Sequence, residues 1–159
     1  MKAQKRIFAK AIYMALMIIS FLFFFRFVRV CDISMFPGMG EGDLVVACFT
    51  DKHYSANDII VYKYKDKYQV RRVVAIDGDT VDITEEGLLI NGKKQDETKI
   101  SGKTFAYKEG IRFPVTLGNR EVFLMADSRE NTSDSRLYGP VRETETLGRV
   151  GFVLRHNNL

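Results

Sequence analysis

The chain has 159 residues, 46% of them hydrophobic, so it is long enough for one modest domain with a core and too apolar to be disordered. The net charge of +4 arises in residues 1–29, which hold six basic residues and no acidic one, leaving 18 basic against 20 acidic residues elsewhere. The basic excess flanks an apolar segment and forms no patch on a folded domain, which excludes nucleic acid as an expected partner.

The longest apolar run covers residues 11–25 and reads AIYMALMIISFLFFF. A helix over residues 7–28 would extend about 33 Å, enough to cross a bilayer if Lys10 and Arg26 direct their charges to the two surfaces. No pair of small residues follows the run, which disfavours a cleavable leader. Four basic residues precede the run and two follow it, which favours an inside N-terminus. We therefore expect a cytoplasmic tip and single membrane anchor at residues 1–29 and an extracytoplasmic domain at residues 30–159.

Beyond the anchor, short β-branched or aromatic runs alternate with turn signals such as Glu86-Gly87 and Asn91-Gly92. The pattern predicts a mainly β domain, a compact barrel or folded sheet, with a long polar excursion at residues 93–118. The expected strands cover residues 44–49, 59–64, 68–76, 80–83, 88–90, 121–125 and 149–154.

The two cysteines, Cys31 and Cys48, leave a single disulfide open, but nothing in their spacing establishes proximity, and two unpaired thiols are the favoured interpretation. His53 and His156 stand alone in the sequence, without the grouping of His, Cys, Asp and Glu that a metal site needs. We expect no metal ion and no other cofactor.

Four segments carry a resemblance to a known family. They are SMFPGMGEGD at residues 34–43, DIIV at 58–61, RRVVAIDGD at 71–79 and ADSRENTSDSRLYGPV at 126–141. Their order, and the anchor before them, resemble the bacterial type I signal peptidases in the single-anchor form of Gram-positive bacteria. The resemblance implies a signal-peptidase type of β domain that engages signal peptides of exported proteins at the lipid bilayer.

The resemblance also implies roles for single residues. Ser34 stands at the nucleophile, and Met35 and Pro37 beside it would contact the substrate. Thr132 takes the position of a hydroxyl that orients the general base. The charged residues of the last segment would form a network that supports the loop beneath the site: Asp127, Arg129, Asp134 and Arg136.

Two positions depart from the family pattern. Arg71 stands where the family has its lysine base, and a guanidinium group effectively never loses its proton in a protein. Lys67 lies four residues earlier, about 13 Å along an extended strand, too far to substitute. Asp32 stands near the oxyanion hole, where a carboxylate would oppose the charge of the tetrahedral intermediate. We expect Asp32 to form an ion pair with Arg71 instead.

Two functions therefore stay open at the level of the sequence. One is a membrane-bound signal peptidase in which Ser34 cuts exported proteins, with an unusual base. The other is a catalytically impaired relative that acts as a non-proteolytic assembly factor, or chaperone, for surface proteins such as pilins. The two share an anchor, a groove and a class of partner.

Overall fold

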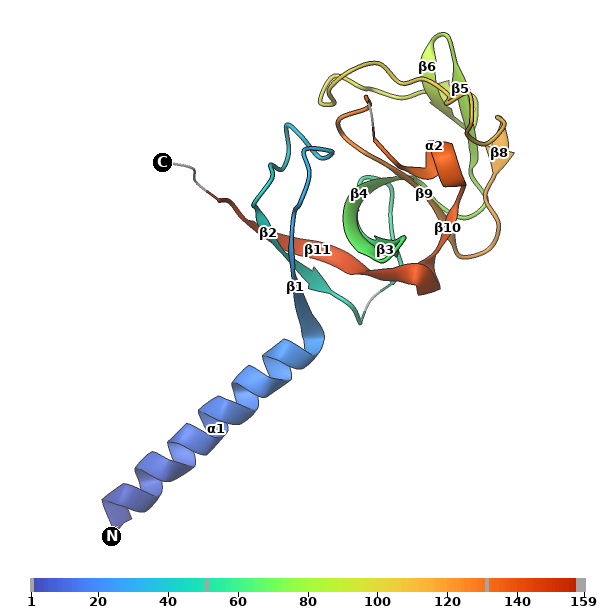
Figure 1. Cartoon of the computed structure of the whole chain (residues 1–159). Coiled ribbons are helices and arrows are strands. Elements are labelled where there is room, and N and C mark those ends of the chain that lie inside the picture. The colour runs from blue at the N-terminus through green and yellow to red at the C-terminus, as the bar shows by residue number, and fades with distance from the viewer. Residues whose placement is uncertain (1, 51, 131, 157–159) are drawn as a thin grey trace.

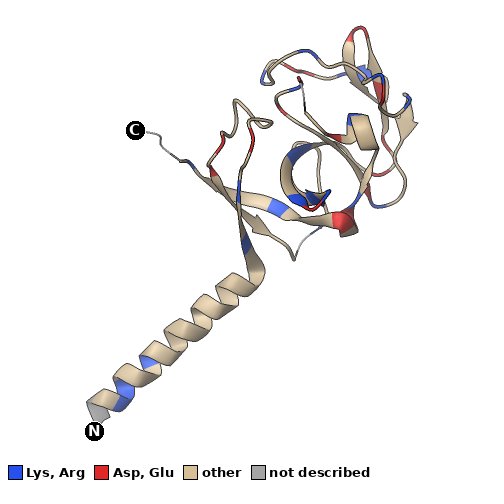
Figure 2. Cartoon of the chain, viewed as in Figure 1, with Lys and Arg blue, Asp and Glu red and all other residues tan. Residues whose placement is uncertain are grey.

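The computed structural model describes residues 2–50, 52–130 and 132–156 and consists of one long helix followed by a β domain (Figure 1). The helix, α1 (Lys2–Phe24), extends away from the β domain. Its segment Gln4–Phe24 is long and apolar enough, by length and composition, to cross a membrane. Figure 2 places the basic residues of α1 toward its N-terminal end and leaves the rest of the helix uncharged.

The helix ends at Phe24, before the predicted end at Val28. Residues Phe25–Arg29 form strand β1, which pairs antiparallel with β2 (Leu44–Cys48) from Phe25↔Cys48 to Arg29↔Leu44. Val28 is 7% exposed and belongs to the core. The helical prediction for residues 25–28 is wrong because pairing with a neighbouring strand outweighs the apolar run that continues from the helix.

The larger sheet has seven antiparallel strands in the order β1-β2-β11-β3-β4-β9-β10. Its remaining members are β3 (Ile59–Tyr64), β4 (Lys67–Ala75), β9 (Glu121–Met125), β10 (Val141–Arg142) and β11 (Thr146–Leu154). The mainly β prediction is confirmed. Among the described residues, the strand pairing runs from β1 to β10 without closing into a barrel, so the folded-sheet form of the prediction describes the domain.

The smaller sheet has four strands in the order β7-β6-β5-β8: β5 (Thr80–Thr84), β6 (Gly87–Ile90), β7 (Lys93–Lys94) and β8 (Val115–Thr116). The predicted turn at Asn91-Gly92 joins β6 to β7, and both residues have positive φ, as a two-residue hairpin loop requires. The other hairpin turn lies at residues 85–86, and Gly87, with φ +107°, begins β6.

Strand β11 connects the parts of the larger sheet, because it pairs with β2 along one side and with β3 along the other. Its pairing with β3 shifts register between Thr146 and Gly148. Gly148 has φ +155°, and a Cβ there would lie 2.1 Å from the Cys48 carbonyl oxygen. Only glycine fits this close approach.

The predicted excursion is irregular between β7 and β8 and packs against the chain segment 126–136. Glu97 pairs with Arg129, and the Tyr107 ring lies 4.5 Å from the Arg136 guanidinium carbon. The segment after it contains a one-turn helix, α2 (Ser135–Tyr138), and a 3₁₀ turn, η1 (Glu143–Glu145).

Strand register also separates the two cysteines. Cys48 lies opposite Phe25, and Cys31 comes six residues after Phe25, about 20 Å further along an extended chain. A disulfide requires Cα atoms within about 7 Å, so Cys31 and Cys48 do not bond to each other.

Candidate active site

Ser34 lies in the loop at residues 30–43, which connects β1 to β2. The two ends of the loop are joined by backbone bonds of 2.8 Å, from Val30 N to Asp43 O and from Gly42 N to Val30 O. The Asp43 carboxylate accepts from Gly40 N at 2.9 Å and His156 N at 2.8 Å, and these two bonds hold its pKa below the ordinary value. Asp43 thus fixes the loop to the chain just after β11, a role that reasoning from the sequence missed.

Two methionines anchor the serine loop in the core. Met35 and Met39 are 0% and 2% exposed and pack with Val45. The neighbouring Pro37 is exposed. This arrangement holds the backbone on either side of Ser34 in place, and the predicted contacts of Met35 and Pro37 with a substrate stay predictions.

The Ser34 hydroxyl contacts a carboxylate and a guanidinium group. Ser34 Oγ donates to Asp32 Oδ1 at 2.5 Å, and the Ser34 backbone N–H donates to the same oxygen at 3.1 Å. Arg71 Nη1 donates to Ser34 Oγ at 2.6 Å. The structure therefore brings together the predicted nucleophile and both of the positions that depart from the family pattern.

Arg71 is 2% exposed and reaches the site from the middle of β4. Besides Ser34, its Nη1 donates to the Val70 carbonyl at 2.7 Å, and its Nε and Nη2 donate to the Ser133 carbonyl at 3.2 and 3.0 Å. These contacts hold the guanidinium plane rigidly beside the serine. Since a guanidinium group keeps its proton, Arg71 supplies a fixed positive charge and no base.

The expected ion pair between Asp32 and Arg71 is present, with 3.8 Å between Asp32 Oδ2 and Arg71 Nη2. The Asp32 side chain is 50% exposed. Solvent screens an ion pair at such a position, which limits its contribution to stability to about 1 kcal/mol or less. Electrostatic attraction alone therefore does not explain why the two groups face the serine.

The segment 126–136 lies directly behind Ser34. Ser128 N donates to the Ser34 carbonyl at 2.8 Å and ties this segment to the serine loop. The Thr132 hydroxyl donates to the Ser128 carbonyl at 3.2 Å and accepts from Arg136 Nη2 at 3.3 Å. The Arg71 guanidinium donates to the carbonyl of the next residue, Ser133. That Thr132 orients a base stays a prediction.

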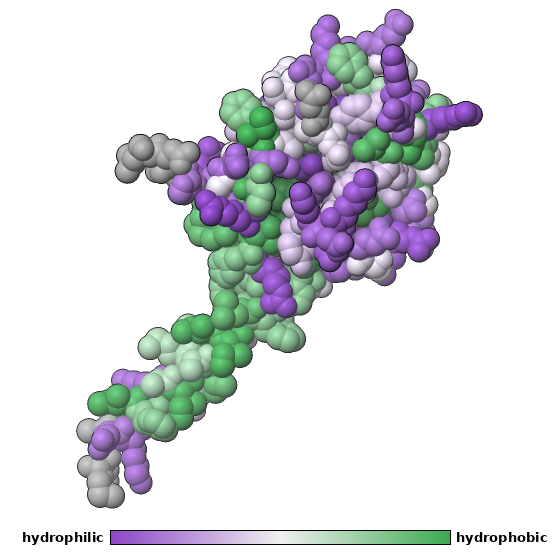
Figure 3. Space-filling view, viewed as in Figure 1, coloured by the Kyte–Doolittle hydropathy of each residue, from purple (hydrophilic) through white to green (hydrophobic). Residues whose placement is uncertain are grey.

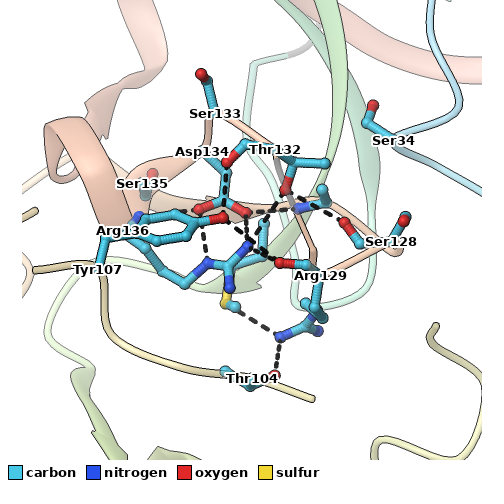
Figure 4. Close-up of polar contacts among 12 residues, drawn as sticks. Ser34, Thr104, Tyr107, Ser128, Arg129, Thr132, Ser133, Asp134, Ser135 and Arg136 are labelled. Carbon is cyan, nitrogen blue, oxygen red and sulfur yellow. Dashed lines mark hydrogen bonds and ion pairs between the residues drawn. The ribbon is translucent and has the colours of Figure 1, made fainter. Parts of the chain in front are cut away.

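The charged residues of this segment are buried and paired. Asp134 and Arg136, both 0% exposed, form an ion pair with 2.8 Å between Oδ2 and Nη2, and Asp134 also accepts from Ala126 N. Figure 4 shows this pair at the centre of the cluster and Ser34 to one side. Arg136 further donates to the Arg129 carbonyl at 2.9 Å.

The other two charges bond outside the segment. Asp127 receives two bonds from Arg72, at 2.8 and 2.5 Å, and Arg129 donates to Glu97 at 3.0 Å. Sequence reasoning missed both partners. Arg72 could have been found, because it lies next to Arg71 and faces the opposite side of the strand, whereas Glu97 lies in the irregular excursion, where no periodicity indicates its direction.

A cleft of about 470 Å³ opens at Ser34. Its lining combines the serine loop, β4 and the segment 126–136, and includes Asp32, Ser34, Gln69, Arg71, Ser128 and Thr132. Lys67 is exposed and pairs with Tyr64 at the turn end of β4. Among the described residues, no group of His, Cys, Asp and Glu side chains could hold a metal ion.

Comparison with known proteins assigns the family. A family model described as "Signal peptidase, peptidase S26" matches residues 4–155. The chain is similar to Signal peptidase I S of Bacillus subtilis, at 33% identity over 136 residues that cover 79% of this chain and 73% of the relative. It is also similar to Signal peptidase IB of Staphylococcus aureus (strain COL), at 27% identity over 138 residues that cover 75% and 72% of the two chains.

A solved structure supports the same fold. The crystal structure of a signal peptidase I from Enterococcus faecalis V583 superposes with a TM-score of 0.50 and 21% identity, and the match covers 60% of this chain and 95% of that one. At this identity the likeness concerns the fold alone. Together with the family match over residues 4–155 and the serine loop beside an apolar helix, these findings show that the chain belongs to the signal peptidase family.

Proposed function

We propose that this chain is a membrane-bound signal peptidase I-like protein that binds signal peptides of exported proteins in the cleft at Ser34 and cleaves them there as a serine endopeptidase. The observation that carries the proposal is the pair of short bonds at Ser34 Oγ, one to Asp32 and one from Arg71, within a cleft of about 470 Å³. A serine attacks a peptide carbonyl only where neighbouring groups take its proton and stabilise charge.

The proposal also covers the position in the cell. The apolar helix would cross the membrane once, with the basic N-terminal residues on the cytoplasmic side and the β domain outside. Only β1 separates α1 from the serine loop, so Ser34 would lie close to the membrane surface. A signal peptide that leaves the bilayer would pass this position.

A second candidate function is a non-proteolytic assembly factor for surface proteins such as pilins. One observation favours it: Arg71 replaces the lysine base and donates to the serine, so the proton transfer typical of the family does not operate here. Such a factor would bind the same membrane-proximal segments and release them uncut.

The two functions separate in one experiment. The full chain in detergent is incubated with a preprotein whose signal peptide ends in an Ala-x-Ala site, and binding and cleavage are measured for the wild type and Ser34→Ala. We expect both proteins to bind and only the wild type to cleave. Binding by both with cleavage by neither would establish the assembly factor, and no binding by either would refute both functions.

Two further variants sharpen the result. Ser55→Ala removes an exposed hydroxyl in the loop before β3 and should behave as the wild type, so it controls for handling and detergent. Arg71→Lys reintroduces the residue of the family pattern. Cleavage by Arg71→Lys alone would mean that the site is complete except for its base, and would support the assembly factor.

A further inference from the structure

We propose that Asp32 is the proton acceptor of Ser34, and that Arg71 is the fixed cation that stabilises the negative charge formed in the reaction. The site would thus use serine and aspartate where the family pattern has serine and lysine. This inference rests on the proposed function, in which the cleft holds a signal peptide.

The direction of the two bonds at Ser34 Oγ follows from the chemistry of the groups. A guanidinium group has only donors, so the contact of 2.6 Å places an Arg71 hydrogen on a lone pair of the serine oxygen. A serine hydroxyl has one hydrogen, and among the described residues the acceptor within reach is Asp32 Oδ1 at 2.5 Å. The proton that the serine must lose to become a nucleophile is therefore already directed at the Asp32 carboxylate.

Hydrogen bonds to the described residues leave Arg71 one hydrogen for the reaction. Four of its five N–H groups are engaged, with Ser34 Oγ, the Val70 carbonyl and twice with the Ser133 carbonyl. The fifth, on Nη2, belongs to the nitrogen that lies 3.8 Å from Asp32 Oδ2, and both residues line the cleft. A buried, fixed positive group at this point stabilises an oxyanion without reorganisation during the reaction.

The reaction balances with these groups alone. The Ser34 Oγ–H proton passes to Asp32 Oδ1 as the Oγ–C bond to the scissile carbonyl forms and the carbonyl π bond opens to an oxyanion. The oxyanion then re-forms the carbonyl π bond as the C–N bond breaks, the Asp32 carboxyl passes its proton to the leaving amine, and an acyl-serine remains. Water repeats the sequence: one of its protons passes to Asp32 as its oxygen bonds to the acyl carbon and the carbonyl π bond opens to an oxyanion. The π bond then re-forms as the Oγ–C bond breaks, Asp32 returns the proton to Ser34 Oγ, and the cleaved signal peptide leaves with a free carboxyl end.

The same transfer removes an electrostatic obstacle. Asp32 Oδ1 also accepts the Ser34 backbone N–H at 3.1 Å, so a carboxylate at this position opposes a nearby oxyanion. Once Asp32 has taken the proton it is neutral, and its hold on the backbone N–H weakens. The transfer of the proton to Asp32 therefore also frees the Ser34 backbone N–H to donate to the oxyanion. A purely structural Asp32, which only caps the turn, would have no such effect on rate.

The test uses a signal-peptide analogue that ends at alanine in a p-nitrophenyl ester, whose leaving group needs no proton. Acylation of Ser34 then appears as a burst of p-nitrophenol, and binding is measured separately with the same peptide ending in an amide. We expect Asp32→Asn to bind the amide as the wild type does and to acylate about 10²- to 10⁴-fold more slowly, the usual loss of a general base. Ser34→Ala gives the background rate.

Two controls make a structural role distinguishable. Asp66→Asn makes the same chemical change at an exposed position in the β3–β4 turn and should leave the burst unchanged. Asp32→Gly should be slow alone and recover with added formate, because a free carboxylate can take the vacant position. A structural contact would show no recovery.

Several results would overturn the inference. An Asp32→Asn burst as fast as that of the wild type, or faster, would show that the carboxylate is a spectator or an obstacle. A wild-type burst no larger than that of Ser34→Ala, with the amide still bound, would refute the inference and leave the binding function intact. Failure of every variant to bind the amide would refute the proposed function as well.

Discussion

Arg71 changes what its neighbours can do. A lysine at this position would bring one ammonium group that can lose its proton, whereas the guanidinium brings five donors and a permanent charge. In the proposed reaction the Ser34 proton is therefore accepted by another group, and Asp32 Oδ1, which accepts the Ser34 hydroxyl at 2.5 Å, is the acceptor we propose. Two departures from the family pattern, each unfavourable for catalysis alone, form one connected group in the structure.

The contacts of Arg71 predict a cost for its conservative replacement. Arg71→Lys keeps the charge but cannot reproduce the bonds to both Ser34 and the Ser133 carbonyl from a buried position. We expect a loss of about 1 to 3 kcal/mol in the free energy of unfolding, measured by urea denaturation in detergent. Arg112→Lys, at an exposed position, should change little. Equal losses in both variants would contradict the role of the Arg71 bonds.

Sequence reasoning reached part of this arrangement. The pairing of Asp32 with Arg71 could be predicted because the family pattern places both positions in the same site, and the two residues carry opposite charges. The bond from Ser34 to Asp32 could not, because it depends on how the chain turns between residues 32 and 34. The partner of Arg129, Glu97, lies 32 residues away in an irregular segment, and only tertiary packing brings it there.

At the scale of elements, the strands were largely predictable and the exceptions have physical reasons. β3 and β9 have the predicted bounds, since each is a short apolar run with β-branched or aromatic residues. β1 was not predicted, because Phe25–Arg29 directly continues the apolar run of the helix. β7 and β8 have two residues each, too few for any periodicity to show.

The register shift at Gly148 can be tested in β11, the strand that connects the parts of the larger sheet. Gly148→Ala would place a Cβ 2.1 Å from the Cys48 carbonyl oxygen at φ +155°, so the backbone of β11 or β2 must shift. We expect a loss of at least about 2 kcal/mol in the free energy of unfolding. Gly151→Ala is the matched control on the same strand, because its Cβ would meet nothing nearer than 3.9 Å. A similar stability of the two variants would argue against the close approach.

The serine loop should respond to acid through Asp43. Bonds from Gly40 N and His156 N lower the pKa of Asp43 below its unfolded value of 3.8. A lowered pKa in the folded state means that the carboxylate stabilises the fold above pH 3.8, and that this contribution is lost as the pH falls through the lower folded pKa. Asp43→Asn should therefore be less stable than the wild type at pH 7.

The same comparison of stability, repeated at acidic pH, provides the check. The difference in unfolding midpoint between Asp43→Asn and the wild type should shrink as the pH is lowered below 3.8. A variant at an exposed carboxylate, Glu86→Gln, should show no such convergence. A difference that stays constant from pH 7 downward would mean that the charge of Asp43 does not support the loop.

At the scale of the whole molecule, the boundary between the helix and the β domain determines which residues the β domain needs in order to fold without the helix. The residues of α1 from Gln4 to Phe24 are all exposed, and Figure 3 shows the apolar surface of the helix continuing onto the nearest part of the β domain. β1, in contrast, is paired with β2 along its full length and contributes Val28 to the core. The helix therefore ends at Phe24 and the first strand begins at Phe25, and we propose this position as the domain boundary in place of the position 29/30 expected from the sequence.

Two truncated chains distinguish these boundaries. A chain that begins at Phe25 keeps β1 and should fold as the full chain does, because it loses only a helix whose side chains pack on little else. A chain that begins at Val30 loses the whole of β1, the burial of Val28, worth about 1.5 to 3 kcal/mol, and the backbone bonds to β2. It also exposes β2 as a hydrophobic edge that can pair with other chains. We expect the second chain to unfold at lower urea concentration and to elute as aggregates in size-exclusion chromatography. Equal urea midpoints for the two chains would place the boundary at residue 30 and show that β1 adds nothing to the stability of the β domain.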